Sequence, residues 1–541
     1  MKDESRSAGV RGSAAQTAGA HVLLGAVRDE LPFLLEWIAY HKVIGFDRIS
    51  LCSNDCTDGT DRLLDALAAA GEIAHFPQSV PEGARPQAMA ARRFRAEGVP
   101  AEGDWAIWLD ADEFLLVRTG AGRVADLVRA MGEARGIAIN WRLFGDGGNA
   151  WFPGRFVGAD FVHAAPYTAA ANRSVKMFYR VGDGVVGPAE IGVHRPLMAA
   201  EHDLDAGDFL GGNGQPLSAT ARRNARWLAG RDALTTHATE PAEQGWALAQ
   251  INHYCVRTPE HYARKQARGR GWGVKGDGAD PRHDAEFQAE MNRNEKLDRE
   301  ILVHERAVDA ELARLRAIPE VLAAEEAGLL SIALDRLPAR KRRQALSGPA
   351  ERFEITFPEA VKAFVTEVYG GAETILEYGS GGSTFVALDQ GATVTTVESD
   401  PLWSASIARS LAHHFPAGGW RVHWADVGPT KMWGVPVDRS AARLWPLYAL
   451  GVWDKPWFTH PDVVLIDGRF RPACLMATLM RAERPVTVLW DDYANRPEYH
   501  WVEEILRPVE TVGRMARFEV TPGRIPPAQV SRAIMSFCDI A

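Results

Sequence analysis

The feature that most constrains this chain is a strand–helix alternation that occurs twice, in two stretches of unrelated sequence. The first begins at His21, where VLLGAV reads as a buried strand, LPFLLEWIAYHKVIG as a helix and RISLC as a second strand. The second begins near Phe357 with an amphipathic helix, followed by the strands TILEYG and TVTTVES. Such alternation is typical of mostly parallel sheets that helices cover on both faces. The sequence therefore predicts two α/β domains rather than an internal repeat.

The 541 residues are predicted to divide into four segments. Residues 1–20 are expected to be a disordered tail, residues 21–315 and 351–541 the two domains, and residues 316–350 a helical connector. The basic run 340–343 in this connector is expected to be a solvated helix end rather than a nucleic-acid site. The segment ARFEVTPGRIPPAQVSRAIMSF is predicted to form two strands joined by a Pro/Gly turn, an antiparallel hairpin at the end of the second sheet.

The composition is that of a globular enzyme, with 46% hydrophobic and 24% charged residues. The net charge of −9 provides no overall basic field for nucleic acid. Five cysteines, an odd and scattered set, indicate reduced thiols and a cytoplasmic location. The N-terminus has no apolar core of a secretory signal, and no apolar run reaches the ~18–20 residues of a membrane-spanning helix. Peripheral membrane contact remains open.

Acidic residues follow three strands of the first alternation. Asp29 and Glu30 come after the first strand, Asp58 after the second, and Asp110 and Asp112 after the fourth. Ligands of open α/β sheets bind at the carboxyl ends of the strands, so these side chains are expected to converge. Carboxylates gathered in this way are costly unless a cation shares the site, and oxygen ligands suit Mg²⁺ or Mn²⁺. The alternative is a merely acidic loop.

Several ordered blocks between His21 and Gly271 carry a family resemblance. These blocks are RDELPFLLEWIAYHKVIGFDRISLCSNDCTDGT, WLDADEF, INWRLFG and INHYCVRTPEHYARKQARG. Together they resemble the family 2-like glycosyltransferases of the GT-A fold, whose D-x-D segment WLDADEF matches. The resemblance implies transfer of a sugar from a nucleotide-sugar donor to a glycan-type acceptor.

The resemblance also implies roles for individual residues. The residues expected to bind the nucleotide part of the donor are Asp29, Glu30, Asp58 and Asp110. Asp112 and His253 are expected to hold Mn²⁺ or Mg²⁺, which would stabilise the charge that develops on the leaving diphosphate.

The remaining polar residues of this region have two interpretations each. Lys176 or Arg173 would neutralise the diphosphate, but Lys176 is more simply expected to be a solvated strand lysine. His194 is expected to be a capped loop histidine. The general base that deprotonates the acceptor is assigned to Asp146 or Glu190, each of which has a polar loop as its alternative.

The second alternation contains a glycine-rich turn directly after a strand. In ILEYGSGGSTF, Glu377 ends the strand, and Gly379, Gly381 and Ser383 turn the chain into a helix. Glycines allow close approach of a ligand to the backbone, and the helix N-terminus offers N–H donors. Thr384 stands where the dinucleotide fingerprint needs glycine, so that fingerprint is not matched.

Residues 357–541 resemble class I S-adenosylmethionine (SAM)-dependent methyltransferases, through E-Y-G-S-G-G-S-T and I-D-G-R together with the predicted terminal hairpin. The resemblance implies that the glycine turn faces the methionine part of SAM, Glu398 the ribose and Asp426 the adenine. Asp467 would face the reacting atoms, and Asp467 or Asp492 would act as the base where the acceptor is protonated.

The favoured function is a bifunctional enzyme of glycan biosynthesis that transfers a sugar and a methyl group. One alternative keeps the glycosyltransferase and makes the C-terminal domain a non-catalytic binding or docking module. Two others make the C-terminal domain an oxidoreductase, or the N-terminal domain a carbohydrate-binding relic.

Overall fold

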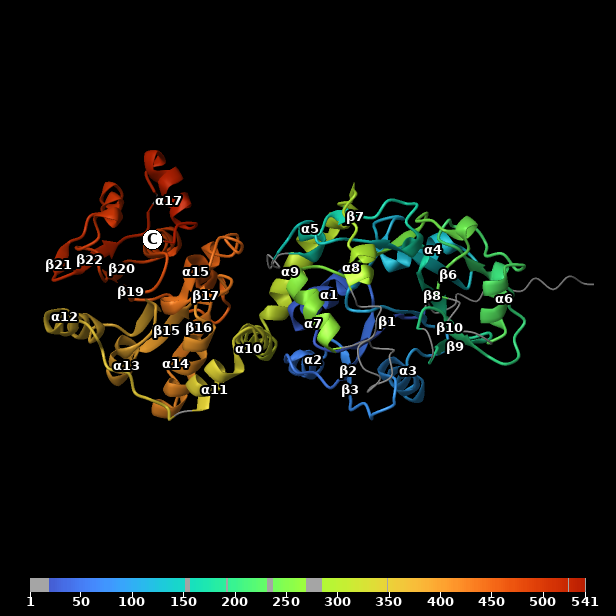
Figure 1. The fold of residues 1–541 in the computed structure, drawn as a ribbon, viewed down its shortest axis with the longest axis horizontal. Coiled ribbons are helices and arrows are strands. Elements are labelled where there is room, and N and C mark those ends of the chain that lie inside the picture. The colour runs from blue at the N-terminus through green and yellow to red at the C-terminus, as the bar shows by residue number, and fades with distance from the viewer. Residues whose placement is uncertain are drawn as a thin grey trace, which may run out of the picture.

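The computed structural model describes residues 19–150, 156–190, 193–230, 237–268, 285–347, 349–523 and 525–540. Two α/β units lie on opposite sides of the long helix α10 (Pro319–Asp335), as Figure 1 shows. The predicted N-terminal tail lies almost wholly outside the described residues. No helix in the described ranges is long and apolar enough to cross a membrane.

The first four strands of the N-terminal unit follow the predicted alternation closely. The elements are β1 (His21–Val27), α1 (Leu31–Val43), β2 (Arg48–Asn54), α2 (Thr60–Ala69), β3 (Ala74–Gln78), α3 (Pro86–Ala96) and β4 (Trp105–Trp108). β1 pairs in parallel with both β2 and β4, and β2 pairs in parallel with β3. The apolar residues that predicted this alternation are buried in the structure. They include Val22–Leu24 of β1 and Trp37 and Ile38 of α1.

The second half of the N-terminal unit extends the same sheet with strands of both directions. Its elements are β5 (Glu113–Val117), α4 (Val124–Met131), β6 (Gly136–Leu143), α5 (Val157–Asp160), β7 (His163–Ala164), β8 (Val175–Arg180), β9 (Val185–Pro188), β10 (Pro196–Met198), β11 (Phe209–Leu210), α6 (Arg222–Leu228), β12 (Ala249–His253), α7 (Pro259–Arg268), α8 (Ala285–Met291), β13 (Lys296–Leu297) and α9 (Glu305–Arg316). The sheet order is β3-β2-β1-β4-β8-β6-β12-β5, with β11 beside β6. β12 pairs with β5 in a register that places His253 opposite Glu113, beside the predicted D-x-D segment.

The predicted connector is helical, in α10 and α11 (Ala339–Ser347). It also joins the two units physically: Glu326 of α10 forms an ion pair with Lys455 of the C-terminal unit at 2.8 Å. On its other face, Gly328 approaches Leu31 and the Asp58 carbonyl so closely that a Cβ atom there would lie 2.5 Å from the leucine side chain. The segment is therefore a packed element between the units.

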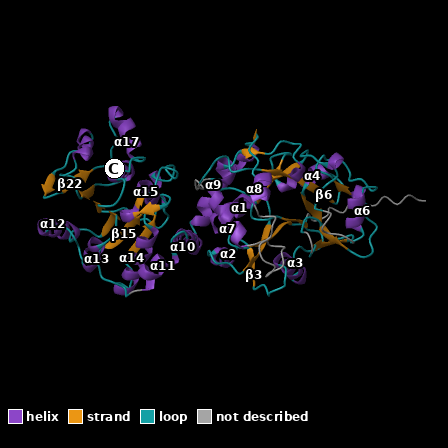
Figure 2. Ribbon diagram, in the orientation of Figure 1, coloured by secondary structure: helices purple, strands orange, loops and turns teal. Residues whose placement is uncertain are grey.

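The C-terminal unit is a second sheet covered by helices on both faces (Figure 2). Its elements are α12 (Glu359–Tyr369), β14 (Thr374–Tyr378), α13 (Gly382–Asp389), β15 (Thr393–Glu398), α14 (Pro401–His414), β16 (Trp420–Trp424), β17 (Thr430–Lys431), β18 (Val435–Pro436), α15 (Pro446–Leu450), β19 (Val463–Ile466), α16 (Arg471–Arg481), β20 (Val486–Trp490), β21 (Glu510–Val512), β22 (Met515–Val520) and α17 (Val530–Ser536). The strand order is β16-β15-β14-β19-β20-β22-β21, with β22 antiparallel to β20 and β21.

The terminal hairpin exists, but the prediction of its strands was wrong. β21 and β22 turn at Gly513, whose φ of 58° favours glycine, so the hairpin lies one strand earlier than expected. The residues after β22 form helix α17, which buries Ala533 and Ser536 at helical spacing. Pro526 and Pro527 begin the 3₁₀ turn Pro527–Gln529 that leads into α17, and do not join two strands.

Candidate functional site

The predicted carboxylates of the N-terminal unit lie at one edge of its sheet. Asp29 and Glu30 follow β1, Asp58 follows β2, and Asp110 and Asp112 follow β4. Because β1 lies between β2 and β4, these three strand ends are neighbours. The convergence predicted from sequence is therefore present, and the partners of each carboxylate indicate what it can do.

Glu30 is a buried carboxylate with two arginines and a histidine as partners, from helix α7 and the loop before it. Arg257 lies 3.2 Å and His261 3.6 Å from Glu30 Oε2, and Arg268 pairs with Oε1. Burial by itself would raise the pKa of Glu30, but these partners, led by Arg268, hold it below its usual range. Arg257 also donates to the Ala111 carbonyl at 2.8 Å, which ties this ion-pair cluster to the D-x-D turn.

Asp58 and Asp29 differ in accessibility. Asp58 is only 1% exposed and accepts hydrogen bonds from the Leu31 N–H at 3.1 Å and from the Thr60 N–H at 2.9 Å, so it fixes the starts of α1 and α2. Burial raises its pKa. Asp29 has a left-handed backbone, accepts from the Thr57 N–H at 2.6 Å and lines a cavity between the units. Asp29 is thus the better placed of the two to meet a ligand.

Lys176 corrects a prediction. It is completely buried on β8, not a solvated strand lysine, because β8 runs through the middle of the sheet between β4 and β6. Its ammonium lies 3.0 Å from Asp110 and 3.4 Å from Glu113. Burial would lower the pKa of Lys176, but the Asp110 and Glu113 carboxylates raise it above its usual value. The predicted loop role of His194 is confirmed by its hydrogen bond to the Val175 carbonyl at 2.8 Å.

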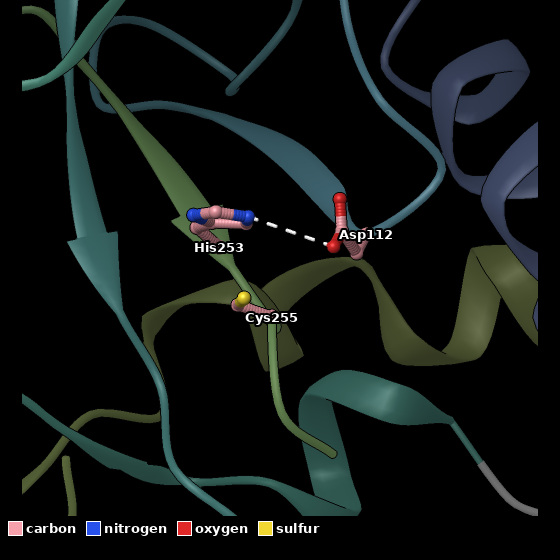
Figure 3. Close-up of side chains that lie close together, drawn as sticks. All are labelled: Asp112, His253 and Cys255. Atoms are coloured by element: carbon pink, nitrogen blue, oxygen red, sulfur yellow. Dashed lines mark ion pairs between the residues drawn. The ribbon is translucent and has the colours of Figure 1, made fainter. Parts of the chain in front are cut away.

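Asp112 and His253, the predicted metal ligands, lie together with a third donor that the sequence analysis missed. In Figure 3, His253 at the end of β12 points at Asp112, and the thiol of Cys255 lies beside both. His253 Nε2 is 3.6 Å from Asp112 Oδ2, and one donor atom from each of the three residues lies within 4.8 Å of the others. All three are buried. The signal available in the sequence was the position of Cys255, two residues after the candidate ligand His253.

These donors do not fit Mn²⁺ or Mg²⁺. Both ions prefer oxygen ligands, whereas this set offers one carboxylate, one imidazole and one thiol. In addition, the ammonium of Lys265 from α7 pairs with Asp112 Oδ2 and lies 3.8 Å from Cys255 Sγ. Burial alone would raise the pKa of Asp112, but Lys265 and His253 lower it well below its usual range. Asp112 is therefore already paired with a cation of the chain itself, the Lys265 ammonium.

The two candidates for the general base lie in different surroundings. Asp146, in the loop after β6, accepts from Asn292 at 2.8 Å and from the Gly148 N–H at 2.9 Å. Glu190 forms ion pairs with Arg92 at 3.0 Å and Arg95 at 2.5 Å, both on α3. Neither contacts the D-x-D carboxylates, and the assignment of the base stays a prediction.

In the C-terminal unit the glycine turn has the predicted position after β14. Gly379 has a φ of 100°, and a Cβ atom there would lie 2.9 Å from the Gly468 backbone nitrogen after β19. Gly382 is equally constrained, because its Cβ would lie 2.2 Å from the Glu354 backbone. Gly381 faces open space instead, and Ser383 lies in the first turn of α13. Of these three glycines, Gly381 is the one with open space where a Cβ atom would stand, so a ligand can approach there.

Two buried glutamates hold this turn in place. Glu377 accepts from Tyr369 at 2.8 Å and from Thr384 at 2.5 Å, and burial raises its pKa to about 7. Glu398, at the end of β15, accepts two hydrogen bonds of 2.6 Å from the N–H and hydroxyl of Ser380, and burial raises its pKa to about 7 as well. Both of these bonds use Oε1 of Glu398, and its contact with the ribose stays a prediction. Glu377 is completely buried and supports the turn, and that it also binds the cofactor stays a prediction.

Asp467 lies in a cluster of carboxylates and arginines at the ends of β19 and β20. It pairs with Arg471 at 3.1 Å, and Arg471 also reaches Asp492 at 3.3 Å. Burial raises the pKa of Asp467 to about 7; Arg471 opposes the shift and the Asp491 carboxyl adds to it. Asp491 is fully buried and pairs with Arg514 at 2.8 Å. Asp467, the most exposed of the three, is the carboxylate that can take up a proton near neutral pH.

Asp426, predicted to meet the adenine, faces the boundary between the units. Arg336 at the end of α10 lies 3.8 Å from Asp426 and 2.6 Å from Glu260 of α7. Beside them lies a cavity of about 130 Å³ that both units line, with Asp29 on one side and Asp426 on the other. Sequence reasoning missed Arg336, although a basic residue at the end of a predicted connector helix was visible.

No protein-family model and no curated protein matches the chain. Among solved structures, a methyltransferase-like protein from Silicibacter pomeroyi DSS-3 is 46% identical over 98% of its own length, with a TM-score of 0.34. The match covers 35% of this chain, the same share that residues 351–541 make up. The chain belongs to this methyltransferase-like family through its C-terminal unit.

Two further solved methyltransferases have lower sequence identity to the present chain. A SAM-dependent methyltransferase from Neisseria gonorrhoeae is 16% identical, with 31% of this chain and 69% of that chain covered and a TM-score of 0.20. An SAH-bound methyltransferase from Podospora anserina is 13% identical, with 37% and 96% covered and a TM-score of 0.21. The family assignment rests on the first relative.

Proposed function

We propose that the C-terminal unit is a SAM-dependent methyltransferase. The observation that carries this proposal is the glycine turn after β14, where Gly381 has open space and the neighbouring Ser380 is held by Oε1 of Glu398, in a unit that belongs to a methyltransferase-like family. The open backbone suits the amino-acid end of SAM, and the carboxylate oxygen suits the ribose hydroxyls. Asp426 is the proposed acceptor for the adenine amino group, at the end of the neighbouring strand β16.

The proposed chemistry needs mainly orientation and one proton acceptor. When held by Gly381, Glu398 and Asp426, SAM would supply a methyl group on a positively charged sulfur for transfer to an acceptor oxygen, with S-adenosylhomocysteine as the leaving group. Asp467 then takes the acceptor proton, for which a pKa of about 7 is well matched. Arg471 holds the Asp467 carboxylate in place through their 3.1 Å ion pair.

Calorimetric titration of the full chain with S-adenosylhomocysteine tests this proposal. We expect saturable binding by the wild type and at least tenfold weaker binding by Glu398→Gln, which loses an acceptor for the ribose. Glu367→Gln, an exposed glutamate of α12, is the matched control and is expected to bind as the wild type does. Binding of NAD in place of S-adenosylhomocysteine would favour an oxidoreductase, and binding of neither would favour a docking module.

For the N-terminal unit, the specific observation is the convergence of Asp29, Asp110 and Asp112 at two neighbouring strand ends, those of β1 and β4. It supports a second proposed activity, transfer of a sugar from a nucleotide-sugar donor to a glycan-type acceptor. Asp110 keeps a one-third-exposed side chain, and Asp29 lines the cavity between the units, so both can contact the nucleoside and ribose of a donor. Lys176, which holds Asp110, would orient that contact.

A thermal-shift screen of nucleotide-sugars checks this activity, because ligands that bind the native state raise its stability. We expect one class of donor to stabilise the wild type and to lose its effect in Asp110→Asn. Asp309→Asn, an exposed residue of α9, is the matched control. If no donor stabilises the chain, or if Asp110→Asn responds as the control does, the glycosyltransferase proposal is wrong.

A further inference from the structure

The cluster of Asp112, His253 and Cys255 has the geometry of a cation site, but the chain has placed a cation of its own there. The ammonium of Lys265 pairs with Asp112 Oδ2, the same oxygen that lies 3.6 Å from His253 Nε2. It also donates to the Cys255 carbonyl at 3.3 Å. Lys265 belongs to α7, which is anchored by Arg268 on Glu30, and its side chain is only 13% exposed.

Neutralisation of the other acidic side chains follows the same pattern. Asp110 and Glu113 share the buried ammonium of Lys176, and Glu30 lies between Arg257 and Arg268. A convergence of carboxylates calls for a cation, and in this unit lysines and arginines of the chain provide it. A divalent ion beside Asp112 would meet the Lys265 ammonium at close range, and like charges in a buried site repel strongly.

We propose that Lys265 takes the place of the divalent ion in the N-terminal unit. Its ammonium is the fixed positive charge that faces the diphosphate of a bound donor, and the three donor side chains become a metal centre only when that ammonium is removed. With one nitrogen, one sulfur and one oxygen ligand, the uncovered centre would take a Zn²⁺-like ion rather than Mn²⁺ or Mg²⁺. The diphosphate part of this claim rests on the proposed glycosyltransferase function, whereas the claim about the ion position does not.

Cobalt titration of the full chain tests the ion position, because a thiolate bound to Co²⁺ gives an intense near-ultraviolet absorption. We expect no such absorption for the wild type, and binding at least tenfold tighter for Lys265→Met. The band should vanish in Lys265→Met combined with Cys255→Ser. Lys296→Met, an exposed lysine of β13, is the matched control and should behave as the wild type does. Lys265→Gln, which keeps a hydrogen-bond donor for Asp112, is a second variant in case the first does not fold.

Two results overturn the proposal. One is a cysteine-dependent cobalt band in the wild type, which would show that Lys265 does not fill the position. The other is the absence of the band in folded Lys265→Met and Lys265→Gln alike, which would show that the three donors form no centre.

The diphosphate claim has a separate readout. Inorganic pyrophosphate should raise the melting temperature of the wild type equally with and without a chelator, and should lose its effect in Lys265→Met. A stabilisation that disappears with the chelator overturns the claim. Failure of every nucleotide-sugar to bind removes the glycosyltransferase proposal but leaves the cobalt result intact.

Discussion

Two pairs of buried carboxylates, one pair in each unit of this chain, are held in opposite charge states. In the N-terminal unit, Glu30 and Asp112 lie beside arginine, lysine and histidine, and their pKa values are lowered. In the C-terminal unit, Glu377 and Glu398 accept from hydroxyl and amide donors, and burial raises both pKa values to about 7. Glu30 and Asp112 are thus held charged, whereas Glu377 and Glu398 are held close to neutral.

This difference bears on which ligands each site favours. A site lined with ion pairs has positive charges already positioned, and an anionic group such as a diphosphate can share them. A site in which carboxylates are poised near neutrality suits hydroxyl donors and a cation, as the ribose and the sulfonium of SAM would provide. The contrast therefore agrees with the two proposed activities, and each of the following experiments acts on one side of it.

The largest effect is expected from removing a buried cation of the N-terminal unit. Arg257 is fully buried, lies 3.2 Å from Glu30 and packs 3.9 Å over the ring of Phe33. Arg257→Met removes one of the cations that pair with the buried Glu30 carboxylate. Loss of one partner of a buried ion pair typically lowers the free energy of unfolding by about 3–5 kcal/mol. Calorimetric melting should show a lower first transition that belongs to the N-terminal unit.

Arg129 provides the matched control for this prediction. It is an exposed arginine of α4 that pairs with Asp126 at 2.8 Å, so Arg129→Met should cost less than about 1 kcal/mol. Equal melting of the two variants would mean that the buried ion pairs do not stabilise the N-terminal unit, and the contrast between the units would lose its basis.

The second prediction concerns the pH dependence that individual buried carboxyls give to the melting transitions. Carboxyls with raised pKa values contribute stability below about pH 4.5, which is lost as the pH rises through about 7. For Glu377 and Glu398 the contribution to the free energy of unfolding at low pH is about 3 kcal/mol each. The lowered pKa of Glu30 acts the other way, so its contribution should be lost as the pH falls below about 4.5, whereas Glu36 of the same unit, whose pKa burial raises to about 8, acts as Glu377 does.

Calorimetry between pH 3 and pH 8 measures these contributions. Glu377→Gln, which resembles the protonated glutamate, should remove part of the slope of the C-terminal transition, while Glu367→Gln should leave it unchanged. A slope that is the same in Glu377→Gln as in the wild type would contradict the charge state assigned to Glu377.

The sequence predicted the strand ends well because the information is local. Apolar runs with turn signals locate β1, β2, β4, β14 and β15, and the carboxyl end of a parallel strand is then the next residue along the chain. Asp29, Asp110 and Glu398 were found in this way. The terminal hairpin was misplaced because PPAQVSRAIMSF has strand-like apolar residues, while its helical spacing only becomes evident from what Ala533 and Ser536 pack against.

The partners of those carboxylates were not predictable by the same means. Arg257 and Glu30 are 227 residues apart in the chain, and Lys265 and Asp112 are 153 apart. No local sequence pattern relates such distant positions. The clustered carboxylates therefore indicated that a cation was needed, and a metal ion was predicted where the chain provides arginine and lysine. Lys176 was misjudged for a related reason, since strand residues on a central strand and on an edge strand have the same period but different burial.

The smallest effect is expected where the two units meet. Arg336 pairs with Glu260 of the N-terminal unit and lies 3.8 Å from Asp426, the proposed adenine acceptor. In Arg336→Ala, Asp426 no longer has to exchange an ionic partner for the adenine amino group. We therefore expect S-adenosylhomocysteine to bind about threefold tighter, equivalent to less than about 1 kcal/mol. Titration calorimetry at low and high salt measures this, and the gain should shrink at high salt because charge pairs near the surface are screened.

Arg342→Ala is the control for this last prediction, because Arg342 lies on α11 of the same connector and pairs with Asp335 without reaching either site. Its affinity for S-adenosylhomocysteine should equal that of the wild type at both salt concentrations. If Arg336→Ala and Arg342→Ala bind alike, the ionic link across the connector has no effect on the C-terminal site, and the two units differ in charge without influencing each other through Arg336.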